Sequence, residues 1–96
     1  MSAVEQSQMT DEQKRMAARI LRHAVGVGSR VPGYRNRYHC SVLSEDYKIL
    51  RKLEEIGLAS CVDQSGGGSF VRFSLTRAGC EEAGLDETEI LRALEE

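Results

Sequence analysis

The side chains best suited to catalysis in this sequence are two histidines, His23 and His39, and three cysteines, Cys40, Cys61 and Cys80. Zinc ligands usually come in pairs two to four residues apart, and these five are not spaced in that way. His39 and Cys40 are neighbours that point to opposite faces of a strand, so they cannot form a hydrogen-bonded nucleophile and base. No phosphate-binding loop or nucleophile elbow is present. We therefore expect no enzymatic activity, no metal site and no cofactor.

The distribution of charge indicates a different chemistry, the binding of an anionic partner. The formal net charge is −2, yet residues 13–44 contain seven basic and no acidic residues, whereas residues 45–96 contain twelve acidic and six basic ones. A surface of one sign attracts a partner of the opposite sign, but a bipolar pattern can also hold two halves of one fold together. Both interpretations remain open from the sequence.

The first basic residues lie on a predicted helix. Thr10 followed by Gln13 has the spacing of a capping box, and an apolar stripe at helical spacing follows it. Three arginines occupy positions i, i+4 and i+7 on another face of this helix, namely Arg15, Arg19 and Arg22. They form either a solvated helix face or one side of a binding surface.

A strand is predicted at residues 34–42, because its residues alternate between two faces. One face is mainly aromatic and aliphatic, with Tyr34 and Tyr38. The other displays Arg35, Arg37 and His39. We expect these three side chains to point outward from a half-buried strand.

The next segment predicts a helix followed by a β-hairpin. Ser44 is a suitable N-cap, and Gly57 can adopt the left-handed conformation that ends a helix. Two strand-like runs, at residues 59–64 and 69–75, are separated by the sequence SGGG, which permits a tight hairpin tip. Arg72 lies on the second run, and we expect Phe70 to pack on the first strand, because cross-strand aromatic pairs commonly stabilise sheets. An exposed aromatic side chain near the hairpin tip is the alternative for Phe70.

Two short helices end the predicted order. Thr76 caps the first, which stops at Gly84, and Asp86 with Glu89 forms a second capping box for the last helix. The apolar edge of the last helix, at Ile90, Leu91 and Leu94, either covers the core or pairs with a second copy of the chain as a homodimer.

These elements predict one α+β domain over residues 10–96, preceded by a polar, flexible N-terminal segment at residues 1–9. The expected order is helix, strand, helix, two strands and two helices, with a small three-stranded antiparallel sheet. No apolar run approaches the ~20 residues of a membrane span, and no signal peptide is seen. Three widely spaced cysteines suit reduced thiols. We therefore expect a cytoplasmic protein that has no membrane partner.

Two resemblances bear on function. The run LRKLEEIGLA at residues 50–59, the glycine-bearing hairpin and the run FSLTRAG at residues 73–79 resemble the recognition helix, wing and post-wing segment of winged-helix regulators of the MarR and PadR type. Together with YRNRY at residues 34–38, the same segment is similar to small phage and prophage proteins. The resemblance implies a winged-helix-like fold and a role in DNA binding and transcription regulation.

The sequence departs from the winged-helix pattern in one respect. Only Val42 and Leu43 separate the predicted strand from the central helix, so a separate positioning helix is missing. The central helix also begins with Glu45 and Asp46, which would repel phosphates. If DNA is bound, we therefore expect the first helix and first strand to bind it.

Two hypotheses remain for a non-enzymatic, phage-type binding module. The first is a DNA-binding regulator that uses basic residues of the first helix, the first strand and the hairpin, namely Arg15, Arg19, Arg22, Arg35, Arg37, His39 and Arg72. The second is a protein-binding inhibitor or modulator of a host complex, which would present the same polarised surface to a host or phage protein. The acid-free basic segment favours nucleic acid, and the net acidity favours protein.

Overall fold

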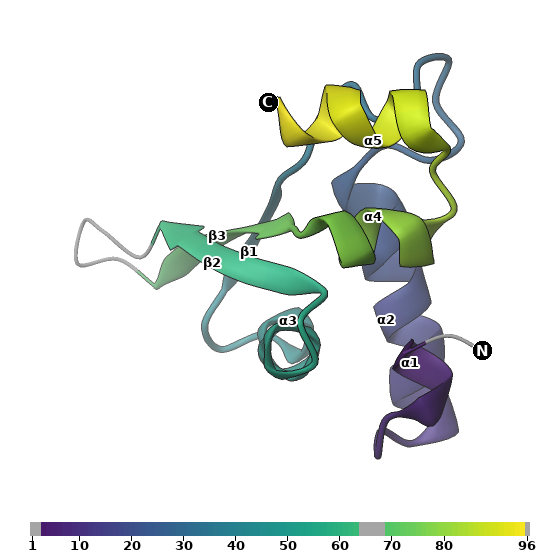
Figure 1. Ribbon diagram of the computed structural model, residues 1–96. Coiled ribbons are helices and arrows are strands. Elements are labelled where there is room, and N and C mark those ends of the chain that lie inside the picture. The colour runs from purple at the N-terminus through teal and green to yellow at the C-terminus, as the bar shows by residue number, and fades with distance from the viewer. Residues whose placement is uncertain (1–2, 64–68, 96) are drawn as a thin grey trace.

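The computed structural model describes residues 3–63 and 69–95, and over these ranges five helices pack around a three-stranded sheet (Figure 1). The elements in chain order are α1 (Ala3–Gln6), α2 (Asp11–Ala24), β1 (Tyr38–Ser41), α3 (Glu45–Glu55), β2 (Ala59–Asp63), β3 (Phe70–Leu75), α4 (Arg77–Ala83) and α5 (Glu87–Leu94). The α+β class and the antiparallel sheet predicted from the sequence are confirmed, and α1 is an addition to the expected order.

The helices begin at the residues that the sequence predicts, because side chains satisfy the free backbone N–H groups of their first turns. The Thr10 hydroxyl accepts a hydrogen bond from the Gln13 N–H at 3.1 Å, and the Gln13 side chain accepts one from the Thr10 N–H at 3.0 Å. Asp86 and Glu89 form the second capping box, with both hydrogen bonds at 2.9 Å. Ser44 and Thr76 cap α3 and α4. These predictions are confirmed.

The sheet has the strand order β1-β3-β2, with both pairs antiparallel. The hairpin predicted at residues 59–75 is confirmed, while the SGGG sequence at its tip lies outside the described residues. The alternating residues of β3 separate two faces: Val71, Phe73 and Leu75 are buried, and Phe70 and Arg72 are exposed. Figure 1 shows α3 on one side of the sheet, and the buried side chains of β3 belong to the same core as those of α3.

The first strand is shorter than predicted. It covers Tyr38–Ser41, because the preceding backbone bonds to α2 instead of continuing the ladder: the Arg37 N–H donates to the Ala24 carbonyl at 3.0 Å. The side chain of Asn36 replaces the missing ladder bonds. Its Nδ2 donates to the Leu75 carbonyl at 3.0 Å, and its Oδ1 accepts from the Leu75 N–H at 2.7 Å. An amide side chain thus imitates a strand residue at the end of β3.

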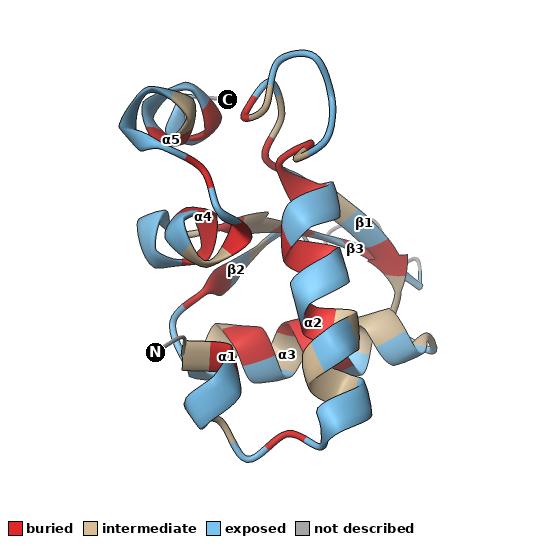
Figure 2. Ribbon diagram, turned by 90° about the vertical axis from the view of Figure 1, so that its right-hand side faces the viewer, coloured by how far each residue is buried: buried red, intermediate tan, exposed pale blue. Residues whose placement is uncertain are grey.

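The core is built from the predicted apolar faces of α2, α3 and β3 (Figure 2). Ile49, Leu50 and Leu53 of α3 are fully buried, as is Phe73. Ile56, which the periodicity placed on the same stripe, lies at the helix C-cap and is exposed. Gly57 then adopts φ +84°, which confirms the predicted left-handed end of the helix.

The N-terminal segment predicted to be flexible contains a helix, α1, that sequence periodicity did not predict. Val4 and Met9 are buried in the core, and the Ala3 N–H donates to Glu82 Oε1 of α4 at 2.7 Å. Two isolated apolar residues among polar ones gave no periodic signal, since the helix has only one turn.

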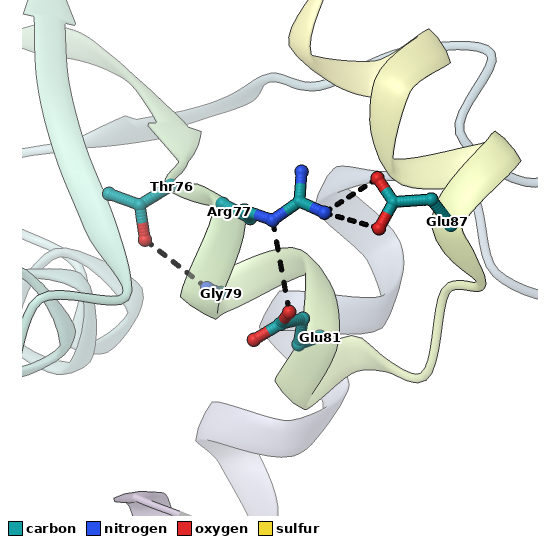
Figure 3. A network of polar contacts seen from close by, with 5 residues as sticks. All are labelled: Thr76, Arg77, Gly79, Glu81 and Glu87. Atoms are coloured by element: carbon teal, nitrogen blue, oxygen red, sulfur yellow. Dashed lines mark hydrogen bonds and ion pairs between the residues drawn. The ribbon is translucent and has the colours of Figure 1, made fainter.

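The last two helices are held to the sheet and to each other by a junction around Thr76 (Figure 3). The Gly79 N–H donates to the Thr76 hydroxyl at 3.2 Å, and a Cβ at Gly79 would lie 2.0 Å from the Leu58 carbonyl oxygen, so only glycine fits this close approach. The Arg77 guanidinium forms an ion pair with Glu87 of α5. These contacts fix where α4 leaves the sheet and where α5 begins.

The apolar edge of α5 divides into two parts. Ile90 and Ala93 are buried against the core, whereas Leu91 and Leu94 are exposed. The last helix therefore covers the core, which was the first of the two alternatives. The second alternative, a homodimer formed through the exposed leucines, stays a proposal.

The expectation that Phe70 packs on the first strand is wrong. Its side chain is 69% exposed and does not pack across the sheet. The register explains this result, because the residue opposite Phe70 on β1 is the small Ser41. On the β1 side, the aromatic ring therefore has no large cross-strand neighbour.

We predict that Asn36→Ala lowers the free energy of unfolding by about 1–3 kcal/mol, because it leaves the buried Leu75 N–H without its acceptor. Urea denaturation measures this change. Ser60→Ala, at an exposed position of β2, is the control and should stay within about 0.5 kcal/mol of the original chain. An unchanged Asn36→Ala stability would contradict the amide pairing.

Thiol reactivity provides a second test of the fold. Burial raises the pKa of the Cys40 and Cys80 thiols above their ordinary value, which reduces the reactive thiolate at neutral pH. Cys61 is only half-buried. We expect iodoacetamide to modify Cys61 first, and Cys40 and Cys80 only after unfolding in urea, as followed by peptide mass spectrometry. Equal rates at all three cysteines in the folded chain would contradict this core.

Candidate functional site

The arginines of α2 line a shallow hollow on the outer side of the helix. Ala17, Ile20, Leu21 and Ala24 bury the opposite side, so the capping box and the apolar stripe together fix the direction of the basic stripe. The hollow has a volume of about 510 Å³ and is lined by Arg15, Ala18, Arg19, Arg22, His23 and Val27. The three arginines predicted as one row are thus neighbours along one depression.

A second hollow continues from the first. It has a volume of about 260 Å³ and is lined by His23, Arg35, Arg37, Tyr38 and His39. His23 lines both hollows, so the basic residues of α2 and those before and on β1 meet at this side chain. One surface formed by the first helix and the first strand is the hypothesis proposed from the sequence, and the two hollows do meet at His23.

Three contacts around His23 hold the two hollows in place. The Arg35 Nε and Nη2 atoms donate to the His23 carbonyl at 3.1 and 2.7 Å, which places a positive charge at the C-terminal end of α2. The imidazole of His23 meets the Tyr38 ring edge-on, with 5.5 Å between the ring centres. The Arg35 guanidinium also lies 5.2 Å from the centre of the Tyr34 ring. The aromatic rings therefore lie directly beside the cations.

Tyr38 separates the basic residues from the nearest carboxylate of α3. Its hydroxyl donates to Asp46 Oδ2 at 2.6 Å. Burial raises the pKa of the Tyr38 phenol, the bond to Asp46 raises it further, and the positive charge of Arg19 opposes the rise. The Asp46 carboxylate itself is occupied by the phenol hydroxyl.

Arg72 extends the basic residues onto β3. It lies directly opposite His39 in the β1–β3 ladder, and both side chains are exposed. We use the term basic surface for the set formed by the two hollows and this strand pair, namely Arg15, Arg19, Arg22, His23, Arg35, Arg37, His39 and Arg72. All seven residues proposed from the sequence belong to it.

Arg15 marks one end of the basic surface. It also lines a third hollow together with Lys14, Asp11, Glu5 and Glu82, where both signs of charge are present. In contrast, among the described residues no carboxylate lines either of the two hollows joined at His23. The lining of these two hollows therefore carries basic side chains only, whereas the third hollow carries both signs.

The exposed face of α3 does not continue this surface. Lys48 lies 3.4 Å from Glu45, and Arg51 donates to Glu54 at 2.6 Å and to the Tyr47 hydroxyl at 2.8 Å. The hydrogen bonds to Glu54 and Tyr47 raise the pKa of Arg51 above its ordinary value. Lys48 and Arg51, two of the three cations of α3, are thus paired within their own helix.

His23 is the residue that sequence reasoning omitted from the site. A signal was available, because His23 follows Arg19 by four residues and therefore lies on the same helix face. Sequence periodicity alone cannot place this face beside β1, since the segment between Ala24 and Tyr38 is irregular.

Across residues 3–63 and 69–95, the structure contains no group of three or more His, Cys, Asp or Glu side chains that could hold a metal ion. None of the helices in the same ranges combines the length and apolar composition that crossing a bilayer requires. Comparisons with protein-family models, curated proteins and solved structures found no match.

We predict that Arg35→Ala lowers the free energy of unfolding by about 0.5–1 kcal/mol, because the C-terminal end of α2 loses a positively charged donor. Thermal or urea denaturation measures the loss. The matched control is Arg22→Ala, which removes an exposed arginine from the middle of the same surface and should change stability less. Equal stability of the two variants would contradict a capping role for Arg35.

Proposed function

We propose that the chain is a non-enzymatic nucleic-acid-binding module and that the basic surface contacts phosphates. One observation carries the proposal: two hollows that share His23 are lined by arginines and histidines, and no carboxylate lines them in the described part of the chain. A continuous row of cations suits a polyanionic backbone, whose contacts with Lys and Arg supply most of the affinity in such complexes.

The charge on the rest of the molecule supports a defined orientation. Helices α4 and α5 carry Glu81, Glu82, Glu87 and Glu89, and α3 begins with Glu45. A polyanion is therefore repelled from these elements and attracted to the basic surface. This explains how a chain of net charge −2 can bind nucleic acid through one side.

The helix that a winged-helix protein would use to read DNA is not the one that we expect to contact nucleic acid here. A winged-helix regulator of DNA would read the major groove with the helix at the position of α3. Here Glu45 and Asp46 lie in the first turn of that helix, and Arg51 is paired with Glu54. We infer a phage-type regulator that binds through α2, the strand β1 and Arg72 of the hairpin, with α3 serving the core.

A protein partner is the second candidate function. Leu91 and Leu94 are exposed on α5, away from the hydrogen bonds that anchor this helix. These leucines offer an apolar contact to a second copy of the chain or to a host protein that the module would inhibit or modulate. We rank the protein partner second because the basic surface combines charge with two hollows and extends over several elements, whereas α5 offers only two exposed leucines.

The test is the affinity of the full chain for a fluorescent oligonucleotide, measured by anisotropy between about 50 and 200 mM salt. Replacing Arg19 and Arg22 together with Gln should weaken binding to all sequences and reduce the salt slope by ~2, because two phosphate contacts are lost. Both side chains are exposed, so the variant should fold.

The matched control replaces Lys48 and Lys52 of α3 with Gln, which removes the same charge from a helix that does not line the basic surface. We expect its affinity to stay close to that of the original chain. Equal losses in the two double variants would show that net charge alone determines binding. Absence of binding to any oligonucleotide would reject the proposal in favour of a protein partner.

A further inference from the structure

Phe70 is a large aromatic side chain on an uncovered part of the sheet. It is 69% exposed, whereas Phe73 on the opposite face of the same strand is fully buried. The residue across from it, Ser41, is small and leaves the ring uncovered. Core packing therefore does not account for Phe70. An exposed ring of this kind has a flat, apolar face that is free for stacking.

Phe70 also lies at the end of the basic surface. Arg72 is on the same face of β3 two residues away, about 7 Å along the strand, and His39 lies opposite Arg72 on β1. His39 in turn lines the hollow that contains Arg35 and Arg37. A continuous path of cations thus runs from α2 through His23 and β1 to a terminal aromatic ring.

This combination matches the physical requirements of single-stranded nucleic acids. Proteins that bind single strands combine a positively charged path for the backbone with aromatic side chains on which bases stack. In a duplex, the bases are already stacked on one another and their faces are inaccessible. An exposed ring beside Arg72 can therefore stack on an unpaired base, whereas a duplex offers it little stacking surface.

The elements of the fold favour the same conclusion. Reading a duplex in its major groove requires a projecting helix or a two-stranded ribbon with side chains directed at base edges. The N-terminus of α3 carries Glu45 and Asp46. The arginines of α2 line a hollow along that helix, which meets the hollow beside β1 at His23. These features accommodate a backbone that follows the protein surface.

We propose that the basic surface binds a single-stranded nucleic acid, with one unpaired base stacked on Phe70. This inference rests on the proposed nucleic-acid binding and adds the strandedness of the ligand and the residue that selects it. The charge path places phosphates near Arg37, His39 and Arg72, and the base at the next position reaches the Phe70 ring.

Anisotropy titrations of the full chain with three labelled probes test this inference: an oligothymidine of about 12 nucleotides, the matching oligouridine, and a duplex of the same length. We expect the single strands to bind more tightly than the duplex. The oligothymidine and oligouridine arms distinguish DNA from RNA. Equal affinity for single strands and duplex would overturn the inference.

Phe70→Ala should weaken single-strand binding by about 5- to 150-fold, the usual effect of removing one base–aromatic stack, and leave duplex affinity almost unchanged. The control is Leu43→Ala. Leu43 is 86% exposed in the turn that follows Ser41. The Leu43→Ala substitution therefore removes a nearby apolar side chain that has no ring. Its affinity should stay within about twofold of the original chain. Similar losses in both variants would indicate general apolar contact and overturn base stacking.

The sequence contains no tryptophan, so Phe70→Trp introduces a single fluorescent reporter at the proposed stack. We expect this variant to retain single-strand affinity and to show quenched emission when the oligothymidine is added. Unchanged emission during saturating binding would overturn the stacking contact.

The outcomes separate the two proposals. If Arg19→Gln with Arg22→Gln abolishes binding while Phe70→Ala and the strandedness have no effect, nucleic-acid binding stands and the stacking inference fails. If the original chain binds none of the three probes, both fail.

Discussion

The hydrogen-bonded pair between the Asn36 side chain and the backbone of Leu75 is the contact on which the site depends. Asn36 lies between Arg35 and Arg37, and its amide is fixed to the end of β3 at 3.0 and 2.7 Å. With the backbone anchored at Asn36, the flanking arginines must turn toward α2, where Arg35 caps the helix at His23. A buried polar pair of this kind specifies one geometry, because each unpaired alternative leaves a buried amide or peptide group without a partner.

Much of the fold was predictable because it is encoded in local interactions. Thr10, Ser44, Thr76 and Asp86 mark helix starts through hydrogen bonds that span three residues, and Gly57 ends a helix through its own backbone angle. The features that were missed depend on contacts distant in sequence. The late start of β1 at Tyr38 follows from the bonding of the preceding residue to Ala24, and the exposure of Phe70 follows from its register opposite Ser41.

The residues of the candidate site were predictable from sequence patterns, whereas a common surface of the first helix and first strand was a hypothesis that these patterns could not establish. Helical spacing placed Arg15, Arg19 and Arg22 in one row, and alternation placed Arg35 and Arg37 on one side of an extended segment. Their meeting at His23 depends on the path of the irregular segment after α2. That path is fixed by long-range contacts: the Gly33 N–H donates to Val25, and a Cβ at Gly33 would lie 2.4 Å from the Glu89 carbonyl oxygen.

The anchoring of this segment by α5 has a consequence for synthesis of the protein. Arg92 Nη1 donates to the Pro32 carbonyl at 2.7 Å, across a sequence separation of 60 residues. At the usual translation rate of about 5–20 residues per second, Pro32 is made roughly 3–12 s before its partner. During this interval the arginine-rich segment has left the peptidyl-transfer site without the helix that will hold it. The basic surface therefore cannot be completed until α5 has been made.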